Sequence, residues 1–314
     1  MPLKNDILTL METQRGRLFS GTVLAERFGV SRNAVWKAVN ALKDEGHLIT
    51  AVGKKGYMLS EENDRLSAEA VRAALGAGFD DVKILICNEV DSTNDAAKRL
   101  LTEENVSRAA IIADSQLCGR GRFGREFYSP AGTGLYLSVV LRPDKSFREA
   151  VMYTAAAAVA AARAIERTTG VSTQIKWIND LYLGGRKVCG ILTEADTDFE
   201  TGRVRSMVIG IGINVTTVSF PEEMADKAAS IGRNVPRCRL AAEIIGGLYR
   251  IIDNEFDFLD EYRERCFLYG REIGFSDGSR SFRGTVAGIG DGCELILDTD
   301  LGRFSFAHGE ITDF

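Results

Sequence analysis

The first sixty residues carry an apolar pattern that predicts two short helices. Four apolar residues recur at the i, i+3, i+4, i+7 spacing of one buried helical stripe: Val35, Ala38, Val39 and Leu42. This spacing predicts a helix over 32–45, and a shorter helix is expected over 22–28. Gly29 supplies the residue that needs a positive φ after the first helix, and Ser31 is expected to cap the second. Together these features indicate a helix-turn-helix.

Two short runs behind this unit alternate between apolar and polar residues as strands do. Residues 48–52 and 57–59 flank a basic turn, Gly53-Lys54-Lys55-Gly56, which predicts a hairpin. A helix-turn-helix followed by such a hairpin is a winged helix. Its candidate DNA contacts lie in the second helix, its cap and the turn: Ser31, Arg32, Asn33, Trp36, Lys37, Lys54 and Lys55. The alternative is a winged helix that contacts only other proteins.

The remaining apolar runs predict a larger domain of mixed strands and helices. Single strands and one hairpin are expected at 109–113, 135–141, 174–192 and 207–213. Helices are expected over 94–101 and 240–269. Glycine and aspartate turns separate four further short strands: 273–275, 282–289, 294–298 and 303–307. Gly210 and Gly212 share one face of their strand, which leaves room there for a flat ligand.

Composition excludes several classes of protein. The chain of 314 residues is 45% hydrophobic and long enough for two or three domains. Its six cysteines are scattered without a C-x-x-C pair and no leader is visible, so a reduced, cytoplasmic chain is expected. The Ala-rich run 150–162 is too short to cross a membrane, and no membrane partner is expected. His47 and His308 are far apart in the sequence, which disfavours a histidine-based zinc site and a Ser-His-Asp triad.

Charge divides the chain unevenly. Residues 1–60 hold nine Lys or Arg against five Asp or Glu, a net charge of +4, and the remainder carries −9. A basic first domain on an acidic protein is a weak indication of nucleic-acid contact. A merely solvated basic face is the alternative.

A glycine- and arginine-rich loop is the most distinctive segment of the chain. Residues 119–125 read Gly-Arg-Gly-Arg-Phe-Gly-Arg and satisfy G-x-G-x-x-G after an expected strand. A dinucleotide-binding turn needs a helix to follow at once, whereas residues 127–134 continue as loop. Three arginines instead suit a flexible backbone that orders around a phosphate or carboxylate and neutralises it. An arginine-rich surface loop is the alternative, and no P-loop motif occurs.

Five motifs, in order along the chain, resemble those of one family, the bifunctional biotin protein ligases that also repress the biotin operon through an N-terminal winged helix. They are Asp91-Ser92-Thr93-Asn94, the loop at 119–125, Lys176-Trp177-Ile178-Asn179-Asp180-Leu181, Arg186-Lys187-Val188-Cys189-Gly190-Ile191-Leu192 and Gly210-Ile211-Gly212-Ile213-Asn214. Cys118 and Cys189 stand where the family often has a small residue such as alanine, and Ile178 stands where it often has proline.

The resemblance implies an α+β chain of three domains. A winged helix-turn-helix would cover residues 1–63, and a central mixed α/β ligase domain of class II synthetase type would cover 64–269. An SH3-like β-barrel would cover 270–314, in agreement with the short strands expected there. The acidic segment 61–64 marks the linker behind the winged helix.

The resemblance also implies an activity that uses biotin, ATP and Mg²⁺. Biotin and ATP would form biotinyl-5'-adenylate, and the biotinyl group would then pass to a lysine of a biotin carboxyl carrier protein. The expected partners are that carrier, operator DNA and a second copy of the chain in a homodimer. The implied catalytic residues are Lys187, Arg122 and Asp180, and Asp180 is also a candidate contact for the Mg²⁺ that accompanies ATP.

Two overlapping sets of residues are implied to bind the substrates. The implied biotin contacts are Ser92, Thr93, Asn94, Gln116, Gly119, Arg120, Arg122, Lys187, Gly190, Ile191 and Gly210. The implied nucleotide contacts are Arg122, Arg125, Lys176, Trp177, Asn179, Lys187, Gly212 and Asn214.

Simpler roles stay open for three of these residues, and other functions stay open for the chain. Ser92 would serve only as a helix cap, Trp177 as a core residue and Asn214 as a turn residue. One alternative function is a DNA-binding regulator that senses a ligand without ligase activity, which the intact Lys187 and arginine loop disfavour. The other is a lipoate ligase-like enzyme that forms an acyl adenylate, which the winged helix disfavours.

Overall fold

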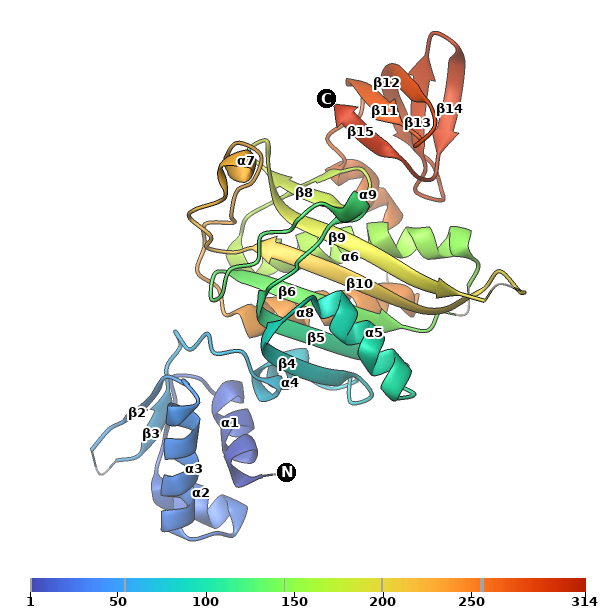
Figure 1. Ribbon diagram of the computed structural model, residues 1–314. Helices are drawn as coiled ribbons and strands as arrows, with labels where there is room; N and C mark the ends of the chain where they lie inside the picture. The colour runs from blue at the N-terminus through green and yellow to red at the C-terminus, as the bar shows by residue number, and fades with distance from the viewer. Residues whose placement is uncertain (1, 54, 144, 199, 255–256) are drawn as a thin grey trace.

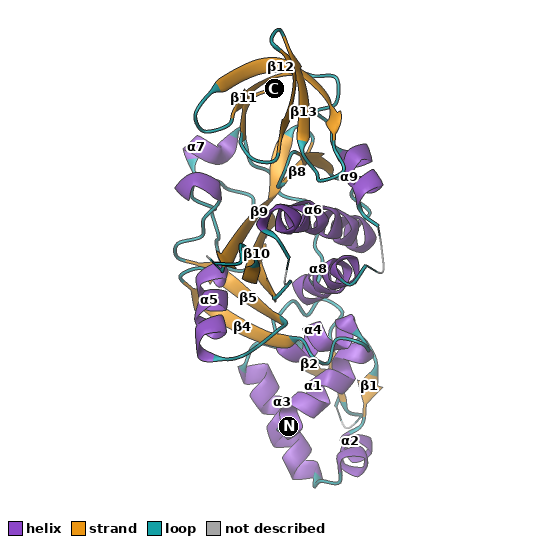
Figure 2. Cartoon of the chain, turned by 90° about the vertical axis from the view of Figure 1, so that its right-hand side faces the viewer, coloured by secondary structure: helices purple, strands orange, loops and turns teal. Residues whose placement is uncertain are grey.

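The computed structural model describes residues 2–53, 55–143, 145–198, 200–254 and 257–314. Three parts follow one another along the length of the molecule, and the winged helix and the C-terminal sheet lie at opposite ends (Figures 1 and 2). Within these described ranges, no helix has the length and apolar character that a membrane span requires.

The predicted winged helix is confirmed, and it contains a further helix at its N-terminal end. Its helices are α1 (Leu3–Thr13), α2 (Gly21–Phe28) and α3 (Arg32–Asp44), and its strands are β1 (Leu18–Phe19), β2 (Ile49–Ala51) and β3 (Tyr57–Leu59). The Ser31 hydroxyl accepts a hydrogen bond from Ala34 N–H at 3.2 Å, and Gly29 has a φ of 64°. These are the cap and the turn that the sequence predicts. The apolar stripe of α3 is buried in a core of its own, together with α1.

A seven-stranded sheet forms the central part, in the order β4-β5-β6-β10-β9-β8-β7. Its strands are β4 (Lys83–Val90), β5 (Ala109–Gln116), β6 (Gly134–Leu141), β7 (Gln174–Lys176), β8 (Asp180–Leu183), β9 (Arg186–Thr197) and β10 (Val204–Asn214). Only β4 and β5 run parallel. The sheet is therefore mixed, as expected.

Helices cover both faces of this sheet. Helices α6 (Phe147–Thr169) and α8 (Arg237–Ile252) pack on one face, and α5 (Thr93–Glu103) packs on the other (Figure 2). Helix α4 (Ala68–Leu75) lies beside α8. The alanines at 155–162 are buried, and their small side chains allow α6 to approach α8 closely.

The single helix expected over 240–269 is wrong. The chain forms α8 and a separate helix, α9 (Leu259–Arg265). Asn254 has a φ of 60°, a left-handed conformation that ends a helix and that asparagine tolerates better than most residues. Apolar residues continue on both sides of this break, so periodicity alone did not reveal it.

The C-terminal part is an antiparallel sheet in the order β14-β13-β12-β11-β15. Its strands are β11 (Glu272–Ser276), β12 (Ser281–Ile289), β13 (Leu295–Thr299), β14 (Gly302–Phe306) and β15 (Glu310–Asp313). Four were predicted, whereas β15 was not. In the described residues β14 and β15 do not pair with each other, so the sheet is open and the expected SH3-like barrel is not confirmed. The Trp177 indole donates to the Cys293 carbonyl at 2.8 Å, and this sheet shares the core of the central part.

Two adjacent residues build the junction between the winged helix and the central part. The Asn63 side chain is fully buried in the winged helix, where it accepts from Leu48 N–H at 2.9 Å and donates to Glu12 at 3.2 Å. The next residue, Asp64, instead accepts from Arg237 at the start of α8. The acidic linker is therefore fastened on both of its sides.

Arg237 is a nearly buried cation with two carboxylate partners. Its side chain is 7% exposed, and it donates to Asp64 and Asp114 at 2.6 Å each and to the Gly134 carbonyl at 3.1 Å. A buried guanidinium is tolerated only where carboxylates neutralise it and acceptors satisfy its donors. Arg237 thus ties the junction to the end of β5 and the start of β6.

We expect Arg237→Met to lower the free energy of unfolding by about 3 kcal/mol, because the variant leaves two carboxylates without their counter-charge. Urea unfolding of the full chain measures this loss. Arg283→Met is the matched control, because Arg283 also lies between two carboxylates, those of Glu272 and Asp313, but is 65% exposed. The control is expected to lose less than about 1 kcal/mol. Equal losses in both variants would contradict the importance of burial.

Candidate functional site

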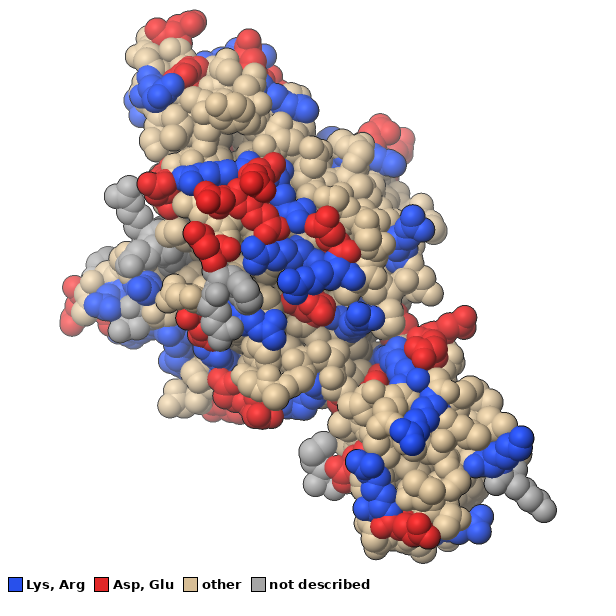
Figure 3. Space-filling view, turned by 180° about the vertical axis from the view of Figure 1, so that it is seen from behind, with Lys and Arg blue, Asp and Glu red and all other residues tan. Residues whose placement is uncertain are grey.

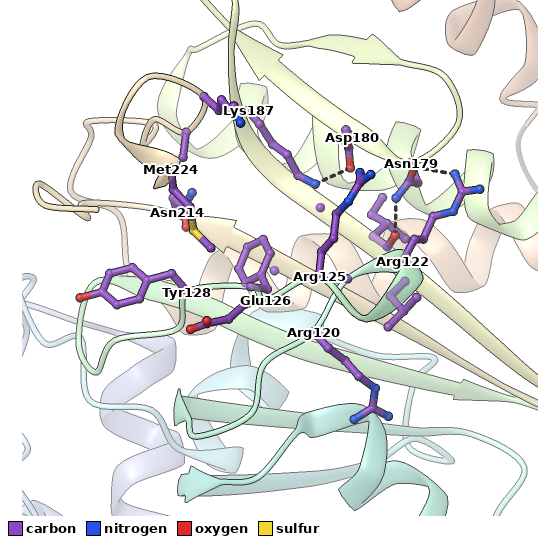
Figure 4. A pocket seen from close by; sticks show the side chains of 18 of the residues that line it. Arg120, Arg122, Arg125, Glu126, Tyr128, Asn179, Asp180, Lys187, Asn214 and Met224 are labelled. Carbon is purple, nitrogen blue, oxygen red and sulfur yellow. Dashed lines mark hydrogen bonds and ion pairs between the residues drawn. The ribbon is translucent and has the colours of Figure 1, made fainter. Parts of the chain in front are cut away.

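A pocket of about 920 Å³ opens between the arginine loop, strands β9 and β10, and the C-terminal sheet (Figure 4). Every residue that the resemblance assigns to biotin, nucleotide or catalysis lines it, with the exception of Gly119. The structure thus brings together motifs that are more than a hundred residues apart in the sequence. The separate role of each residue stays a prediction.

One end of the pocket is a network of uncharged polar side chains. Gln116 Oε1 accepts from the backbone N–H and the hydroxyl of Thr93, at 2.9 and 3.1 Å. The buried Ser138 hydroxyl lies 2.8 Å from the Thr93 hydroxyl and 2.6 Å from Asn94 Oδ1. Hydroxyls and amides suit a neutral ligand group that both donates and accepts hydrogen bonds. Ser138 was not predicted from the sequence, because it lies inside an apolar strand.

The simpler roles left open for three residues have different outcomes. Ser92 stands before α5, but its side chain makes no capping hydrogen bond. Trp177 is 4% exposed and belongs to the core, although its edge also lines the pocket. The Asn214 amide donates to the Ala229 carbonyl at 3.1 Å, which ties the end of β10 to a later segment of the chain.

The glycines of β10 and of the loop make room for side chains. A methyl group on Gly210 would lie 2.4 Å from Asn94 Oδ1, and one on Gly212 would lie 2.5 Å from the Phe127 ring. Both glycines nevertheless line the pocket, and the room that the sequence predicts there for a flat ligand stays a prediction. Gly119 does not line the pocket, and a methyl group there would lie 2.5 Å from the Phe127 carbonyl oxygen.

Lys187 lines the pocket from the start of β9. Its Nζ is 2.7 Å from Asp180 Oδ1, an ion pair drawn in Figure 4. A methyl group on Gly190 would meet the Lys187 side chain at 2.9 Å, so the glycine provides the space in which the lysine lies. An ammonium group held in this way can move from the carboxylate to an incoming phosphate.

Arg122 adds a second cation next to this pair. It donates to the Gly309 carbonyl at 2.6 Å and lies 3.4 Å from Asn179 Oδ1. Burial lowers the pKa of Arg122, but a guanidinium remains charged at neutral pH. Asn179 is itself fixed, because its amide donates to the Ile191 carbonyl at 2.7 Å.

The donor set at Asp180 fits a Mg²⁺ that arrives with a nucleotide. Asp180 Oδ1 is buried, and apart from its ion pair with Lys187 it makes no hydrogen bond of good geometry. The described part of the chain holds no group of three or more His, Cys, Asp or Glu side chains suited to a metal. Mg²⁺ commonly binds one or two carboxylates together with substrate phosphates and water. One carboxylate with an oxygen that lacks a hydrogen bond, next to Lys187, fits this mode of binding.

The C-terminal sheet contributes residues that the sequence analysis missed. Lys176 Nζ lies 4.3 Å from the centroid of the Phe314 ring, and that ring also packs against Tyr182. Burial lowers the pKa of Lys176. Glu310 pairs with Arg125 of the loop. No local pattern could reveal these contacts, because they join segments far apart in the sequence.

The exposed face of α3 carries the candidate DNA contacts. Ser31, Arg32, Asn33, Trp36 and Lys37 are all exposed, and Trp36 is 53% exposed. Lys55 is exposed in the turn of the hairpin, whereas Lys54 lies outside the described residues. In the view from behind, Lys and Arg side chains are spread over the winged helix (Figure 3).

Comparisons with known proteins agree with both parts of this description. Residues 87–214 match the model of the biotin/lipoate A/B protein ligase family, and residues 4–58 match an HTH domain. The chain is 32% identical over 311 residues to the bifunctional ligase/repressor BirA of Bacillus subtilis, which covers 96% of this chain and 95% of that protein. It is 30% identical over 294 residues to BirA of Escherichia coli, with 91% and 89% covered.

Solved structures show the same relationship. A biotin protein ligase from Aquifex aeolicus, in complex with biotin and ATP, superposes with a TM-score of 0.62 at 27% identity, covering 73% of this chain and 97% of that one. The fold and the pocket define a ligase domain of the biotin/lipoate type joined to a winged helix. The chain belongs to the biotin/lipoate A/B protein ligase family and, within it, to the bifunctional ligase/repressors.

We expect Gly210→Ala to displace the Asn94 side chain and to lower the free energy of unfolding by about 1–3 kcal/mol, as overpacking does. Biotin binding should weaken as well, because Asn94 is part of the polar network. Calorimetric titration with biotin and urea unfolding measure the two effects. Gly288→Ala is the control, because a methyl group there would meet Tyr269 at an ordinary 3.9 Å. Unchanged biotin affinity in Gly210→Ala would contradict the role given to Asn94.

Proposed function

We propose that this protein is an ATP-dependent biotin protein ligase and a biotin-responsive transcriptional repressor. One observation carries the proposal: a single pocket is lined both by an uncharged polar network and by the cations Lys187, Arg122 and Lys176. A ligand that is neutral at one end and reacts with a nucleotide at the other needs both kinds of side chain. The family membership supports biotin as that ligand.

The first step brings together two anions, the biotin carboxylate and the α-phosphate of ATP. Lys187 and Arg122 would neutralise the charge that develops there, and Mg²⁺ at Asp180 would supply further charge neutralisation on the phosphates. Ser92, Thr93 and Gln116 would bind the ureido ring. In the second step Asn179 and Asp180 would orient the incoming lysine amine of the carrier protein.

The proposal also includes the oligomeric state, the domain boundaries and the location of the protein. The protein would form a homodimer on operator DNA, because one winged helix reads only a short half-site and paired half-sites add specificity. The three domains would divide at residues 63/64 and 269/270, the central fold would be of class II synthetase type, and the C-terminal sheet would be SH3-like. The location would be cytoplasmic.

The two alternative functions have less support. A regulator without ligase activity would not need the pairing of Lys187 with an under-bonded Asp180 oxygen. A lipoate ligase-like enzyme would not need the ureido-binding network, and the full-length relatives are ligase/repressors with a winged helix.

We expect Lys187→Ala to slow biotinyl-adenylate formation at least about 100-fold, as expected for the loss of one oriented charged donor. The assay combines the full chain with ATP, Mg²⁺ and labelled biotin, and then with a biotin carboxyl carrier domain. Arg186→Ala removes the neighbouring exposed cation and should leave the rate unchanged. Near-normal adenylation by Lys187→Ala would refute the assignment, and no labelled carrier with the unmodified chain would refute the ligase.

We expect biotin and ATP together to tighten operator binding by the full chain, and high salt to weaken it, because lysines and arginines release counterions from DNA. Gel-shift titration with operator DNA measures both effects. Lys37→Ala should lower affinity for all DNA sequences, whereas Lys83→Ala, which removes a half-buried lysine of the central part, should not. Equal DNA affinity with and without biotin and ATP would contradict the control of DNA binding by these ligands, although the winged helix would still bind DNA.

A further inference from the structure

Arg120 differs from the other two arginines of the loop in the direction that it takes. Arg122 and Arg125 extend toward Asn179 and the C-terminal sheet, whereas Arg120 points away from them, toward α5 (Figure 4). We propose that Asp95 and Glu194 are positioning residues that anchor the arginine loop by holding Arg120. The catalytic consequence of this anchor rests on the proposed function, whereas the anchor itself does not.

The contacts of Arg120 are those of a fixed structural group. Both terminal nitrogens bind the Asp95 carboxylate in a bidentate pair, with Nη2 2.6 Å from Oδ1. The same Nη2 lies 3.4 Å from both oxygens of Glu194. The hydrogen bond from Arg120 lowers the pKa of Asp95, and the pKa of Arg120 is raised. A bidentate arginine–carboxylate pair fixes orientation as well as distance, because two parallel bonds forbid rotation.

The backbone around Arg120 forms the neck of a small hairpin. Phe127 N–H donates to the Gly119 carbonyl at 2.9 Å, and Gly121 N–H donates to the Arg125 carbonyl at 2.7 Å. The backbone of Arg120 pairs with that of Glu126 in an antiparallel β-bridge across the neck. An anchor on Arg120 therefore holds both arms of the hairpin, whereas Arg122 at the tip donates to the Gly309 carbonyl of the C-terminal part.

Glu194 connects this anchor to the polar end of the pocket. It accepts from the Asn94 amide at 2.7 Å and from Lys98 at 2.5 Å. Asn94 Oδ1 in turn faces the Ser138 hydroxyl of the network at 2.6 Å. The orientation of Asn94 and the position of the loop thus depend on one carboxylate, so a loop that loses its anchor also loosens the residues assigned to biotin.

Different arginines of the loop therefore anchor the loop and contact the ligand. Arg120 stays bound to the carboxylates of Asp95 on α5 and Glu194 on β9 and so fixes the base of the loop. Arg122 and Arg125 are the side chains that change partners when a ligand enters. This differs from the implied role of Arg120 as a biotin contact. It predicts that removing the anchor loosens the loop without removing the charges that act on phosphate.

Hydrogen exchange on the ligand-free full chain tests the anchor directly. Asp95→Asn should speed exchange of the amides at 117–128 at least about tenfold, because the neck opens more often. Glu194→Gln should give a smaller rise, and Asp95→Glu should restore protection, because it keeps the charge. Exchange in β6 should not change. Unchanged exchange at 117–128 in Asp95→Asn, or equal acceleration in β6, would overturn the proposal.

Arg99→Gln is the matched control. Arg99 on α5 forms a bidentate pair with the side chain of Asp91, which precedes the helix, and the two side chains are 52% and 45% exposed. The backbone hydrogen bond from Cys118 N–H to the Asp91 carbonyl does not involve this pair. Loss of this pair should leave exchange at 117–128 unchanged. An acceleration equal to that of Asp95→Asn would show that any lost ion pair on α5 loosens the loop, which would overturn the specific role of Arg120.

Kinetics with biotin, ATP and Mg²⁺ tests the consequence for the reaction. Asp95→Asn should raise KM for biotin about tenfold and release adenylate faster, with kcat for adenylate formation within about threefold, as expected of a loosened lid. A fall in kcat with unchanged KM would overturn the positioning role. If the unmodified chain forms no adenylate, the proposed function fails, and the exchange experiment still decides whether the anchor exists.

Discussion

The Arg237 guanidinium must keep two carboxylates beside it, and much of the architecture follows from that requirement. A nearly buried cation cannot be left unpaired, so Asp64 and Asp114 are held within 2.6 Å of it. Asp64 follows the residue that is buried in the winged helix, and Asp114 precedes Gln116 by two residues on β5. The DNA-binding part and the polar end of the pocket therefore rest on one rigid support, which is the kind of physical continuity that a ligand-controlled repressor needs.

Close packing shapes the pocket as strongly as charge does. The glycines of β9 and β10 line the pocket and also let Asn94, Phe127 and Lys187 approach the sheet more closely than a Cβ would allow. A pocket built in this way has polar and charged side chains set directly against a sheet, where neighbouring strands fix their positions. Such preorganisation matters for a reaction between two anions, because groups that are already in place need not reorganise as charge develops.

The sequence was most informative where the determining interactions are local. The cap at Ser31, the turn at Gly29 and the stripe of α3 depend on residues within a few positions of each other, and all three were predicted. The break at Asn254 was missed because apolar residues continue past it. The contacts of Arg125 with Glu310 and of Lys176 with Phe314 join distant segments, and only the folded chain brings them together. The motifs therefore identified the pocket but not the C-terminal residues that close it.

The cations of the pocket differ in what an incoming phosphate must displace. Lys187 is held by Asp180 and Arg125 by Glu310, so under the proposed function each would exchange one anion for another when a phosphate binds. Arg122 instead donates to a carbonyl and lies next to an amide oxygen, and a phosphate replaces neutral acceptors there. Replacing a carboxylate by a phosphate changes the electrostatic energy of a cation little. At Arg122 a phosphate would replace neutral acceptors, so the electrostatic energy would become more favourable, and burial strengthens this effect. Under the proposed function, Arg122 would therefore favour the bound nucleotide most, and Lys187 would move between Asp180 and the phosphates as charge develops.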